Sequence, residues 1–385
     1  IGVISYIIVP FIRDVFFNLG FINISDFLEV GSVRLTISLL LIWLFVLINI
    51  VGGKVYKNTL IPMLVIMFVL GSIVLISGLV YDQNDFINSV LNSENRVIGP
   101  ISDIKFDWRI FLTASTLMFS SFIGFDAIAQ TGNEAKNPTK NIPRAILLAI
   151  FIVASYYILF TISVYNIVPW SFVADESITK DITAPGLLSY VLPPFWGILI
   201  IIGAAIALIN DLPAMILSVS RLMFAWAKDS IFPNRVALIH SKFNTPYIAI
   251  ILVGFVASIG AIGSHFAGDF FLGIDIMVTS MMINFLLMCV TLISIQKVNF
   301  KLFRNITVIK NRTIQLFIGY TGTLIILIFL IIHTYKDLSS NVEEWYFHST
   351  YIYLIVMTIA SIYFALRWKT VQVKNKNTFK TLPVE

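Results

Sequence analysis

Charged residues, cysteine and histidine are all scarce in this chain of 385 residues. Only 12% of the residues are charged, whereas a soluble domain has roughly a quarter, and 58% are hydrophobic. A chain this apolar has too little polar surface to cover itself in water. Its solvent must be lipid, so the composition excludes soluble domains and indicates one membrane domain.

The scarcity of metal-binding residues excludes several kinds of site. The single cysteine, Cys289, lies in an apolar run, where a buried and unreactive thiol is its ordinary role, and no disulfide can form within the chain. The four histidines include no pair at metal-ligand spacing. We therefore expect no metal, no cofactor, no catalytic residues and no nucleic-acid partner.

Long apolar runs follow one another along the chain. A helix needs about 20 apolar residues to cross a bilayer. Nine stretches meet or approach that length, and they predict an all-α polytopic membrane protein: 35–52, 59–80, 110–130, 144–168, 192–220, 247–265, 270–295, 313–333 and 350–367. Residues 1–12 are apolar but too short to span, and no Met precedes them. We expect them to be the partial end of a tenth helix, in a fragment of a longer protein.

Lysine and arginine are unequally divided between the two sides of the predicted spans. Alternate loops from 53–58 onward, with the helix ends beside them, hold most of the 26 Lys and Arg residues. Loops rich in these residues stay in the cytoplasm. The C-terminal tail is therefore expected in the cytoplasm, with the protein in the plasma membrane, and the net charge of +5 calls for no anionic partner.

Three aspartates remain inside the predicted spans. Charge in hydrocarbon is costly, so an intramembrane carboxylate is a candidate functional residue. Asp275 lies near the start of its span, where a position at the membrane interface is the simpler explanation. Asp211 comes two residues before Pro213 and could sit at a kink, so a functional site and an interface position both remain open. Asp126 is the strongest candidate because of its neighbours.

Small and polar residues cluster in the middle of the span 110–130. The segment Phe119-Ser-Ser-Phe-Ile-Gly-Phe-Asp126 contains one glycine. Gly124 weakens a helix by about 1 kcal/mol relative to alanine. A break there exposes backbone polar groups, which a membrane protein tolerates only beside a cavity. The alternative is a continuous helix with a packing glycine.

A break at Gly124 would suit a transporter. Carbonyls near Phe122 and Ile123 could receive a substrate ammonium group, and amides near Phe125 and Asp126 would offer the positive end of a helix dipole. Asp126 could cap the second half-helix or bind a proton. Phe119, Phe122 and Phe125 could close over a substrate, or they could be ordinary lipid-facing and core residues.

Two stretches resemble one family of membrane proteins. Residues 119–150, FSSFIGFDAIAQTGNEAKNPTKNIPRAILLAI, are similar to the sixth helix, the following loop and the start of the seventh helix of the amino acid–polyamine–organocation (APC) superfamily permeases. The matching positions are Gly124, Phe125, Asp126, Glu134, Lys136, Asn137, Pro138, Lys140, Ile142 and Pro143. Residues 220–246 resemble the end of the eighth helix and the next cytoplasmic loop, through Ser220, Arg221, Ala227, Asp229, Pro233, Phe243, Thr245 and Pro246.

The resemblance implies a twelve-helix permease with the inverted five-helix-repeat (LeuT-like) transporter fold, present here incompletely. The chain would be a single membrane domain, 1–385, in which residues 1–12 end helix 3, 35–80 form helices 4 and 5, 110–295 form the second repeat (helices 6–10), 313–367 form helices 11 and 12, and 368–385 form the cytoplasmic tail. Helices 1 and 2 and most of helix 3 would lie upstream. The family's glycine-rich break, which holds the substrate carboxylate, would lie there too.

The function that the resemblance implies is secondary active transport of amino acids or related amines by alternating access. The substrate-binding residues carried over are Ser120, Ile123, Gly124, Phe125 and Asp126. Phe119 and Phe122 are candidate gates, since Ser120 stands where several members have a large aromatic residue, and Asp211 and Met215 form a candidate second tier. The implied partners are a small-molecule amino acid or amine and membrane lipid. The oligomeric state is left open.

The coupling ion and two other protein classes also stay open. The span 59–80 contains no lysine, so the helix-5 lysine of some proton-coupled members is not expected, and proton coupling, sodium coupling and exchange all remain. A membrane-embedded enzyme would need clustered histidines or carboxylates, and the three aspartates are widely spaced with no histidine near them. A non-transporting sensor or partner subunit, or an inactive fragment, is the main alternative, which uptake by the full-length protein would exclude.

Overall fold

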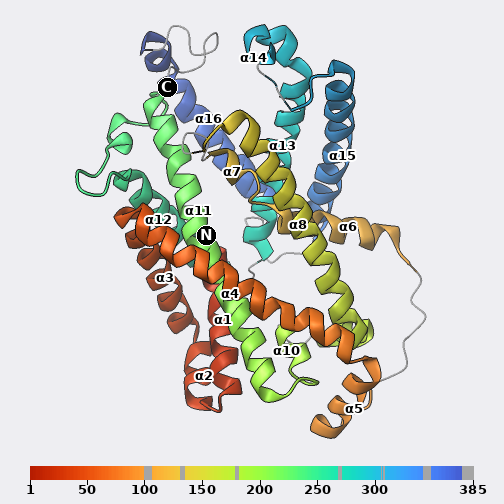
Figure 1. Ribbon diagram of the computed structural model, residues 1–385. Coiled ribbons are helices and arrows are strands. Elements are labelled where there is room, and N and C mark those ends of the chain that lie inside the picture. The colour runs from red at the N-terminus through yellow and green to blue at the C-terminus, as the bar shows by residue number, and fades with distance from the viewer. Residues whose placement is uncertain are drawn as a thin grey trace. The chain divides into compact units, whose positions relative to one another are not determined.

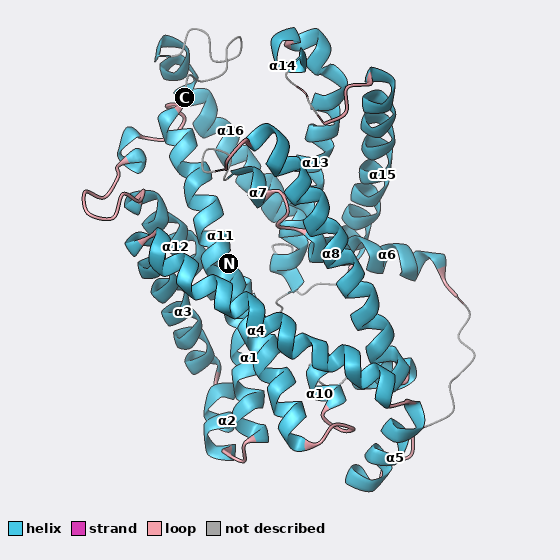
Figure 2. Cartoon of the chain, in the orientation of Figure 1, coloured by secondary structure: helices cyan, strands magenta, loops and turns pink. Residues whose placement is uncertain are grey.

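The computed structural model describes residues 1–98, 106–130, 135–177, 182–267, 271–304, 306, 308–340 and 348–374. Every regular element in these ranges is helical (Figure 2). Nine helices there are long and apolar enough to cross a membrane. The predicted all-α polytopic class and the predicted number of full spans are therefore confirmed.

Several helices extend past the ends that hydropathy predicted. The apolar start forms α1 (Gly2–Asn18), which continues beyond residue 12. Helix α11 (Pro194–Lys228) ends at a lysine, and helix α15 (Arg312–Ser339) continues past Lys336 and Asp337, both well beyond their predicted ends. Hydropathy stops at the first cluster of charges, whereas backbone hydrogen bonds continue through them.

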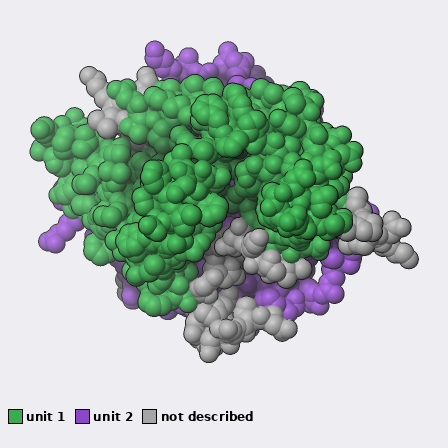
Figure 3. All heavy atoms as spheres, turned by 90° about the horizontal axis from the view of Figure 1, so that it is seen from below, with its two compact units in different colours: residues 1–105, 151–219, 239–266 green, residues 106–150, 220–238, 267–385 purple. Residues whose placement is uncertain are grey.

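The chain divides into two compact units, and the boundary runs through α8 (Pro138–Ile167) and α11. Unit 1 contains Ile1–Lys105, Phe151–Val219 and Ile239–Phe266, and unit 2 contains Phe106–Ile150, Ser220–Leu238 and Ala267–Glu385. Figure 3 colours the two units, and Figure 1 labels their helices. Each unit is described separately below.

Unit 1 is built from long helices whose backbones approach closely. Its further elements are α2 (Ile22–Glu29), α3 (Gly31–Val51), α4 (Gly53–Val80), α5 (Gln83–Glu94), α9 (Trp170–Ser177), α10 (Ala184–Leu188) and α12 (Tyr247–Ala267). A Cβ on Gly78 of α4 would lie 2.5 Å from Ser163 of α8, and one on Gly2 would lie 2.5 Å from the Ala257 carbonyl of α12. Small residues at such crossings let membrane helices pack closely.

Short helices outside the spans close one end of unit 1. A buried cluster joins α4 and α8 to α5, α9 and α10, with Phe86 and Phe172 in contact edge to face, their ring centroids 5.1 Å apart. The segments between the spans at this end are thus packed structure as well as connections.

Unit 2 contains the interrupted helix. Its elements are α6 (Trp108–Met118), η1 (Phe119–Phe122), α7 (Ala127–Gln130), η3 (Asn234–Ala237), α13 (Phe271–Val298), α14 (Phe300–Arg304), α15 and α16 (Ser349–Lys374). Helices α13 and α15 run side by side (Figure 1), and α13 also packs against α6, η1 and α16. A Cβ on Gly322 would lie 2.9 Å from the sulfur of Cys289, which is partly exposed and not fully buried as predicted.

Candidate functional site

The helix predicted at 110–130 is interrupted. Helix α6 ends at Met118, the turn η1 follows, and Ile123 is extended, with φ −70° and ψ 138°. Gly124 has φ +123°, which side-chain-bearing residues rarely adopt. Helix α7 then begins at Ala127. The expected break is confirmed, and the alternative of a continuous helix is wrong.

Position 124 requires glycine because of its backbone conformation and not because a side chain would lack space. No heavy atom lies within 4 Å of the position that a Cβ would take. An alanine would therefore meet no neighbour but would keep an unfavourable φ. The position gives the chain a sharp change of direction between two helical segments, which is the local feature that the predicted site needs.

Backbone polar groups are left open at the break. The Ile123 amide donates to the Ser120 carbonyl at 3.1 Å, and the Gly124 amide donates to Oδ1 of Asp126 at 3.3 Å. In the described part of the chain, the Ile123 carbonyl receives no hydrogen bond and the amides of Phe125 and Asp126 donate none. These groups could serve as an acceptor for an ammonium group and as donors for an anionic group.

Two roles were left open for Asp126, and the structure bears on one of them, the capping of the second half-helix. Its side chain accepts from the amide of Gly124, which precedes it, and so stabilises the turn before α7. Only its backbone carbonyl takes part in α7, by accepting from the Ala129 amide at 3.0 Å. The described part of α7 is a single turn, so the expected helix dipole finds little support, whereas the open amides remain.

Two of the phenylalanines at the break pack against one ring of α13. Phe285, which is 8% exposed, lies with its ring centroid 5.3 Å from that of Phe125, nearly parallel at 16°. The same ring contacts Phe119 edge to face at 5.9 Å. Phe122, at 37% exposed, is the more accessible candidate gate. Sequence analysis missed Phe285, one of 32 phenylalanines, because nothing in its own segment distinguishes it.

The candidate second tier lies in unit 1, whereas residues 119–126 lie in unit 2. Asp211 is exposed and Met215 is half-buried, both on α11. Nearby, the amide group of Asn49 donates to the Pro213 carbonyl at 3.3 Å and to the Phe45 carbonyl at 2.9 Å. The role of Asp211 and Met215 stays a prediction.

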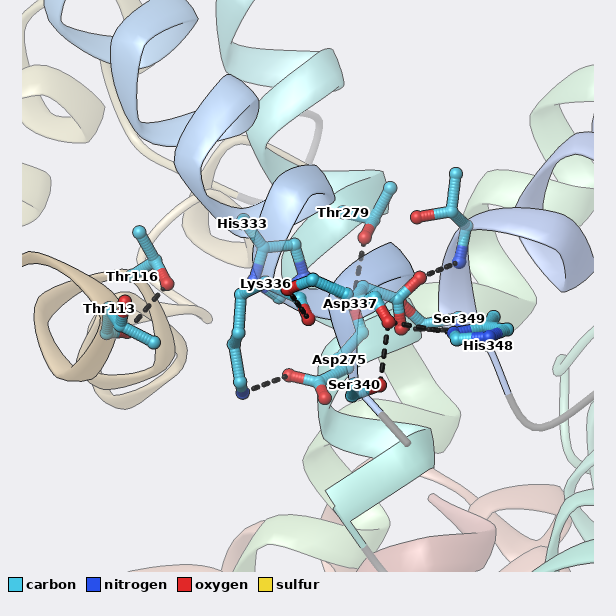
Figure 4. Close-up of polar contacts among 12 residues, drawn as sticks. Thr113, Thr116, Asp275, Thr279, His333, Lys336, Asp337, Ser340, His348 and Ser349 are labelled. Atoms are coloured by element: carbon cyan, nitrogen blue, oxygen red, sulfur yellow. Dashed lines mark hydrogen bonds and ion pairs between the residues drawn. The ribbon is translucent and has the colours of Figure 1, made fainter. Parts of the chain in front are cut away.

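A polar cluster joins α13 to α15 within unit 2 (Figure 4). Oδ1 of Asp275 lies 3.6 Å from Nζ of Lys336, and Nε2 of His333 lies 3.3 Å from the Asp275 carbonyl oxygen. Asp275 is therefore paired within the protein, and the expectation that no histidine joins an aspartate is wrong. Because α15 continues to Ser339, His333 and Lys336 lie three residues apart on one helix face.

Asp337, which follows Lys336 on α15, caps the start of α16. The two carboxylate oxygens of Asp337 accept from the amides of Ser349 and Thr350, both at 2.9 Å. The Asp337 carbonyl accepts from Oγ of Ser340 at 2.6 Å and from Nδ1 of His348 at 2.7 Å. No group of three or more potential metal ligands occurs among the residues that the structure describes.

An open groove of about 520 Å³ lies between α6 and this cluster. Its lining residues are Asp107, Arg109, Ile110, Thr113, Ala114, Leu117 and Lys336. The Arg109 guanidinium lies 5.9 Å from the ring centroid of Tyr335 on α15. Lys336, whose side chain is 31% exposed, thus forms part of the wall of this groove.

The loop residues of the sequence resemblance have structural roles where they are described. Asn137 has φ 49°, its carbonyl accepts from the Asn141 amide at 3.0 Å, and Pro138 begins α8. Oγ1 of Thr245 donates to the Ile50 carbonyl at 2.6 Å. Glu134 lies outside the described residues.

Comparison with known proteins identifies the family. The model of the amino acid permease family matches residues 1–381. The chain belongs to the amino acid permease family. This is a family of membrane transporters and not of enzymes, in agreement with the predicted class.

Individual relatives are more distant and are matched over parts of their length. The chain is 32% identical over 159 residues to an uncharacterized transporter of Mycobacterium tuberculosis, covering 40% of this chain and 35% of the relative. It is 27% identical to a branched-chain amino acid permease of Bacillus subtilis (38% of this chain, 31% of the relative) and 27% identical to cationic amino acid transporter 4 of Mus musculus (41% and 24%). The matches thus span about a third or less of these curated relatives.

Proposed function

We propose that this chain belongs to a secondary active transporter for amino acids or related amines, with the substrate ammonium group bound at the break 119–126. The observation that carries the proposal is the interruption of a membrane helix at Gly124 in a permease family member, beside which the Ile123 carbonyl and the Phe125 and Asp126 amides have no hydrogen bond among the described residues. A transported zwitterion needs polar partners inside the membrane, and the backbone groups at an interrupted helix supply them.

Within this proposal the residues of the break have separate roles. The Ile123 carbonyl accepts from the ammonium group, and Asp126 supplies a negative charge close to it while its Oδ1 holds the turn through Gly124. Ser120, Phe125 and Gly124 shape the pocket wall, and Phe122 is the gate that moves. Alternating access then requires relative motion of helix groups, with no covalent chemistry.

We propose a class of substrates and not a single amino acid. The relatives include one named for branched-chain amino acids and one named for cationic amino acids. What these substrates share is the ammonium and carboxylate pair, and the backbone groups at the break are suited to that shared part. The side-chain preference would be set by the residues around Phe119 and Phe122.

We also propose that the Lys-rich loops and the C-terminal tail face the cytoplasm, in the plasma membrane, as the charge distribution indicates. A chain with Cys289→Ala and a new cysteine at Lys374 tests this topology. A membrane-impermeant thiol reagent should label that cysteine only after cells are opened. Labelling in intact cells would reverse the orientation.

The decisive experiment is uptake by the full-length protein in proteoliposomes, with a panel of amino acids and amines and with proton, sodium or no gradient. Uptake or exchange of at least one of these substrates is expected. Asp126→Asn, which keeps an acceptor for the Gly124 amide, should weaken binding at least about tenfold, equivalent to about 1.4 kcal/mol. Wild-type behaviour of this variant removes the role of Asp126. Binding without uptake would instead identify a sensor or partner subunit.

A further inference from the structure

His333 is an ionisable residue that the transport proposal does not use. It lies on α15 inside a membrane span and is 0% exposed. Ionisable side chains inside membrane spans are costly to bury and usually have a function. The hydrogen bonds of its two ring nitrogens show whether the ring can accept a proton.

The contact of His333 with α13 determines which ring nitrogen carries the proton. Nε2 lies 3.3 Å from the backbone carbonyl oxygen of Asp275. Because a carbonyl oxygen can only accept, Nε2 must carry the hydrogen. In the neutral ring, Nδ1 is then unprotonated, and it is buried with no hydrogen-bond partner among the described residues. His333 therefore presents an unsatisfied base inside the protein.

Charged groups on the neighbouring helices surround this base. From α13, the carboxylate of Asp275 is 15% exposed, and its Oδ1 is buried without a hydrogen bond, 3.6 Å from Nζ of Lys336. On α15, Asp337 follows Lys336, and its carboxylate is occupied by the amides at the start of α16. His348 bonds to the Asp337 carbonyl.

On α6, Asp107 and Arg109 line the groove that Lys336 also reaches. While His333 is neutral, the negative charge of Asp275 is balanced by the positive charge of Lys336. A proton on His333 would place a second cation beside Asp275.

We propose that His333, Asp275 and Lys336 form a proton-binding site, with Nδ1 of His333 as the acceptor and Asp275 as the counter-ion. A proton from solvent adds to the Nδ1 lone pair and gives an imidazolium, and no other bond is broken. Lys336, whose side chain is 31% exposed, connects the site to the groove. The site lies on the Lys-poor side of the membrane.

The position of the site on α13 links it to the interrupted helix. Asp275 and Phe285 are ten residues apart on α13, which corresponds to about 15 Å along a helix. Protonation changes the electrostatic contact between α13 and α15, and the ring of Phe285 on the same α13 supports the break. A consequence for transport, namely uptake that depends on pH on the Lys-poor side, rests on the proposed function.

Nitrogen NMR of this chain of 385 residues in lipid nanodiscs tests the site without requiring transport. With ¹⁵N-labelled histidine the chain gives signals from four residues. The variants His240→Gln, His265→Gln and His348→Gln assign three of them, so His333 is identified even if its own variant fails to fold. At high pH we expect the Nε2–H tautomer for His333, and as pH falls we expect its nitrogen signals to move to those of the imidazolium form.

Two variants should move the midpoint of this titration in opposite directions. Asp275→Asn removes the counter-ion and should lower the midpoint by about one pH unit or more, whereas Lys336→Met removes a competing cation and should raise it. His265→Gln is the matched control, because Nδ1 of His265 already has a partner in the hydroxyl of Tyr6 at 3.1 Å. That variant should leave the His333 midpoint unchanged.

The outcomes separate this site from the proposed function. The proton site is overturned if the His333 ring stays neutral at every pH at which the protein is folded, if it carries its hydrogen on Nδ1, or if both variants shift its midpoint in the same direction. If the NMR result holds and no substrate is transported under any gradient, the transport proposal fails and the proton site stands. If both hold, Asp275→Asn should shift the pH profile of uptake in the same direction as the NMR midpoint.

Discussion

The ring of Phe285 on α13 lies almost parallel to the ring of Phe125, 5.3 Å from centroid to centroid and inclined by 16°. Phe119, on the other side of Gly124, contacts the same ring at 5.9 Å. One side chain thus supports both sides of an interrupted helix. The break has only short turns in place of a continuous α-helix, so packing against α13 should supply part of its stability.

Phe285→Ala should destabilise the break. Truncating a buried phenylalanine costs about 3–5 kcal/mol in protein cores, because the surrounding side chains close only part of the cavity that the ring leaves. We expect a lower unfolding temperature in detergent and faster hydrogen exchange over 119–126. Phe317→Ala is the control, because Phe317 is 69% exposed on α15 of the same unit. Equal effects of the two variants would show that Phe285 gives no special support.

Gly124→Ala should act through the backbone alone. The new methyl group meets no atom within 4 Å, but φ +123° is strained for alanine, at about 1–3 kcal/mol. The variant should therefore lose thermal stability or change the shape of the break, and uptake should fall. Gly263→Ala is matched, since its methyl group also meets nothing within 4 Å and its φ is ordinary. That control should be neutral or slightly stabilising.

The positions of the break and of the spans could be predicted because both are local features. Apolar runs of sufficient length indicate spans, and Gly124 among small and polar residues indicates a weak point in one of them. The loop after the break carried the resemblance that correctly predicted the family.

The support of the break and the polar cluster could not be predicted in this way. Phe285 and Phe125 are 160 positions apart in the sequence, and their contact depends on which helices pack together. Hydropathy falls where charges begin, so the predicted span 313–333 ended at His333 and left Lys336 outside it. The structure continues α15 to Ser339 and pairs those charges with Asp275, which removes the reason for ending the helix.

Tyr190, outside the spans in unit 1, should make stability depend on pH in the alkaline range. Burial first, and then its hydrogen bond to Glu94 at 2.6 Å, raise the pKa of Tyr190 from 10.0 to about 12. Because the folded protein holds this proton more tightly than the unfolded chain, the stability is fully present below pH 10. It is lost as pH rises from 10 to about 12.

The absorbance of the phenolate and the unfolding temperature, each measured against pH, test this prediction. Tyr190→Phe should remove part of the alkaline loss of stability, whereas Tyr165→Phe, at an exposed tyrosine of the same unit, should not. An unchanged alkaline profile in Tyr190→Phe would mean that the hydrogen bond with Glu94 does not contribute.

Asp337 and Asp107 both accept hydrogen bonds from amides at the start of a helix, and comparing them tests how the start of α16 is stabilised. Asp337 uses both carboxylate oxygens, one for the Ser349 amide and one for the Thr350 amide. Asp107 uses Oδ1 alone for the amides of Arg109 and Ile110 at the start of α6. Asparagine has one acceptor oxygen and an NH2 group that cannot accept. Asp107→Asn should therefore keep its cap, whereas Asp337→Asn should lose one of its two bonds.

Replacing a helix cap by alanine costs about 0.5–2 kcal/mol, so Asp337→Ala should lower the unfolding temperature more than Asp337→Asn does. Hydrogen exchange at the amides of Ser349 and Thr350 distinguishes the cap from a general loss of stability. Only one of the two should exchange faster in Asp337→Asn, and both in Asp337→Ala. If Asp107→Asn is as harmful as Asp337→Asn, the negative charge matters at both helix starts, and the count of acceptor oxygens is not what sets their stability.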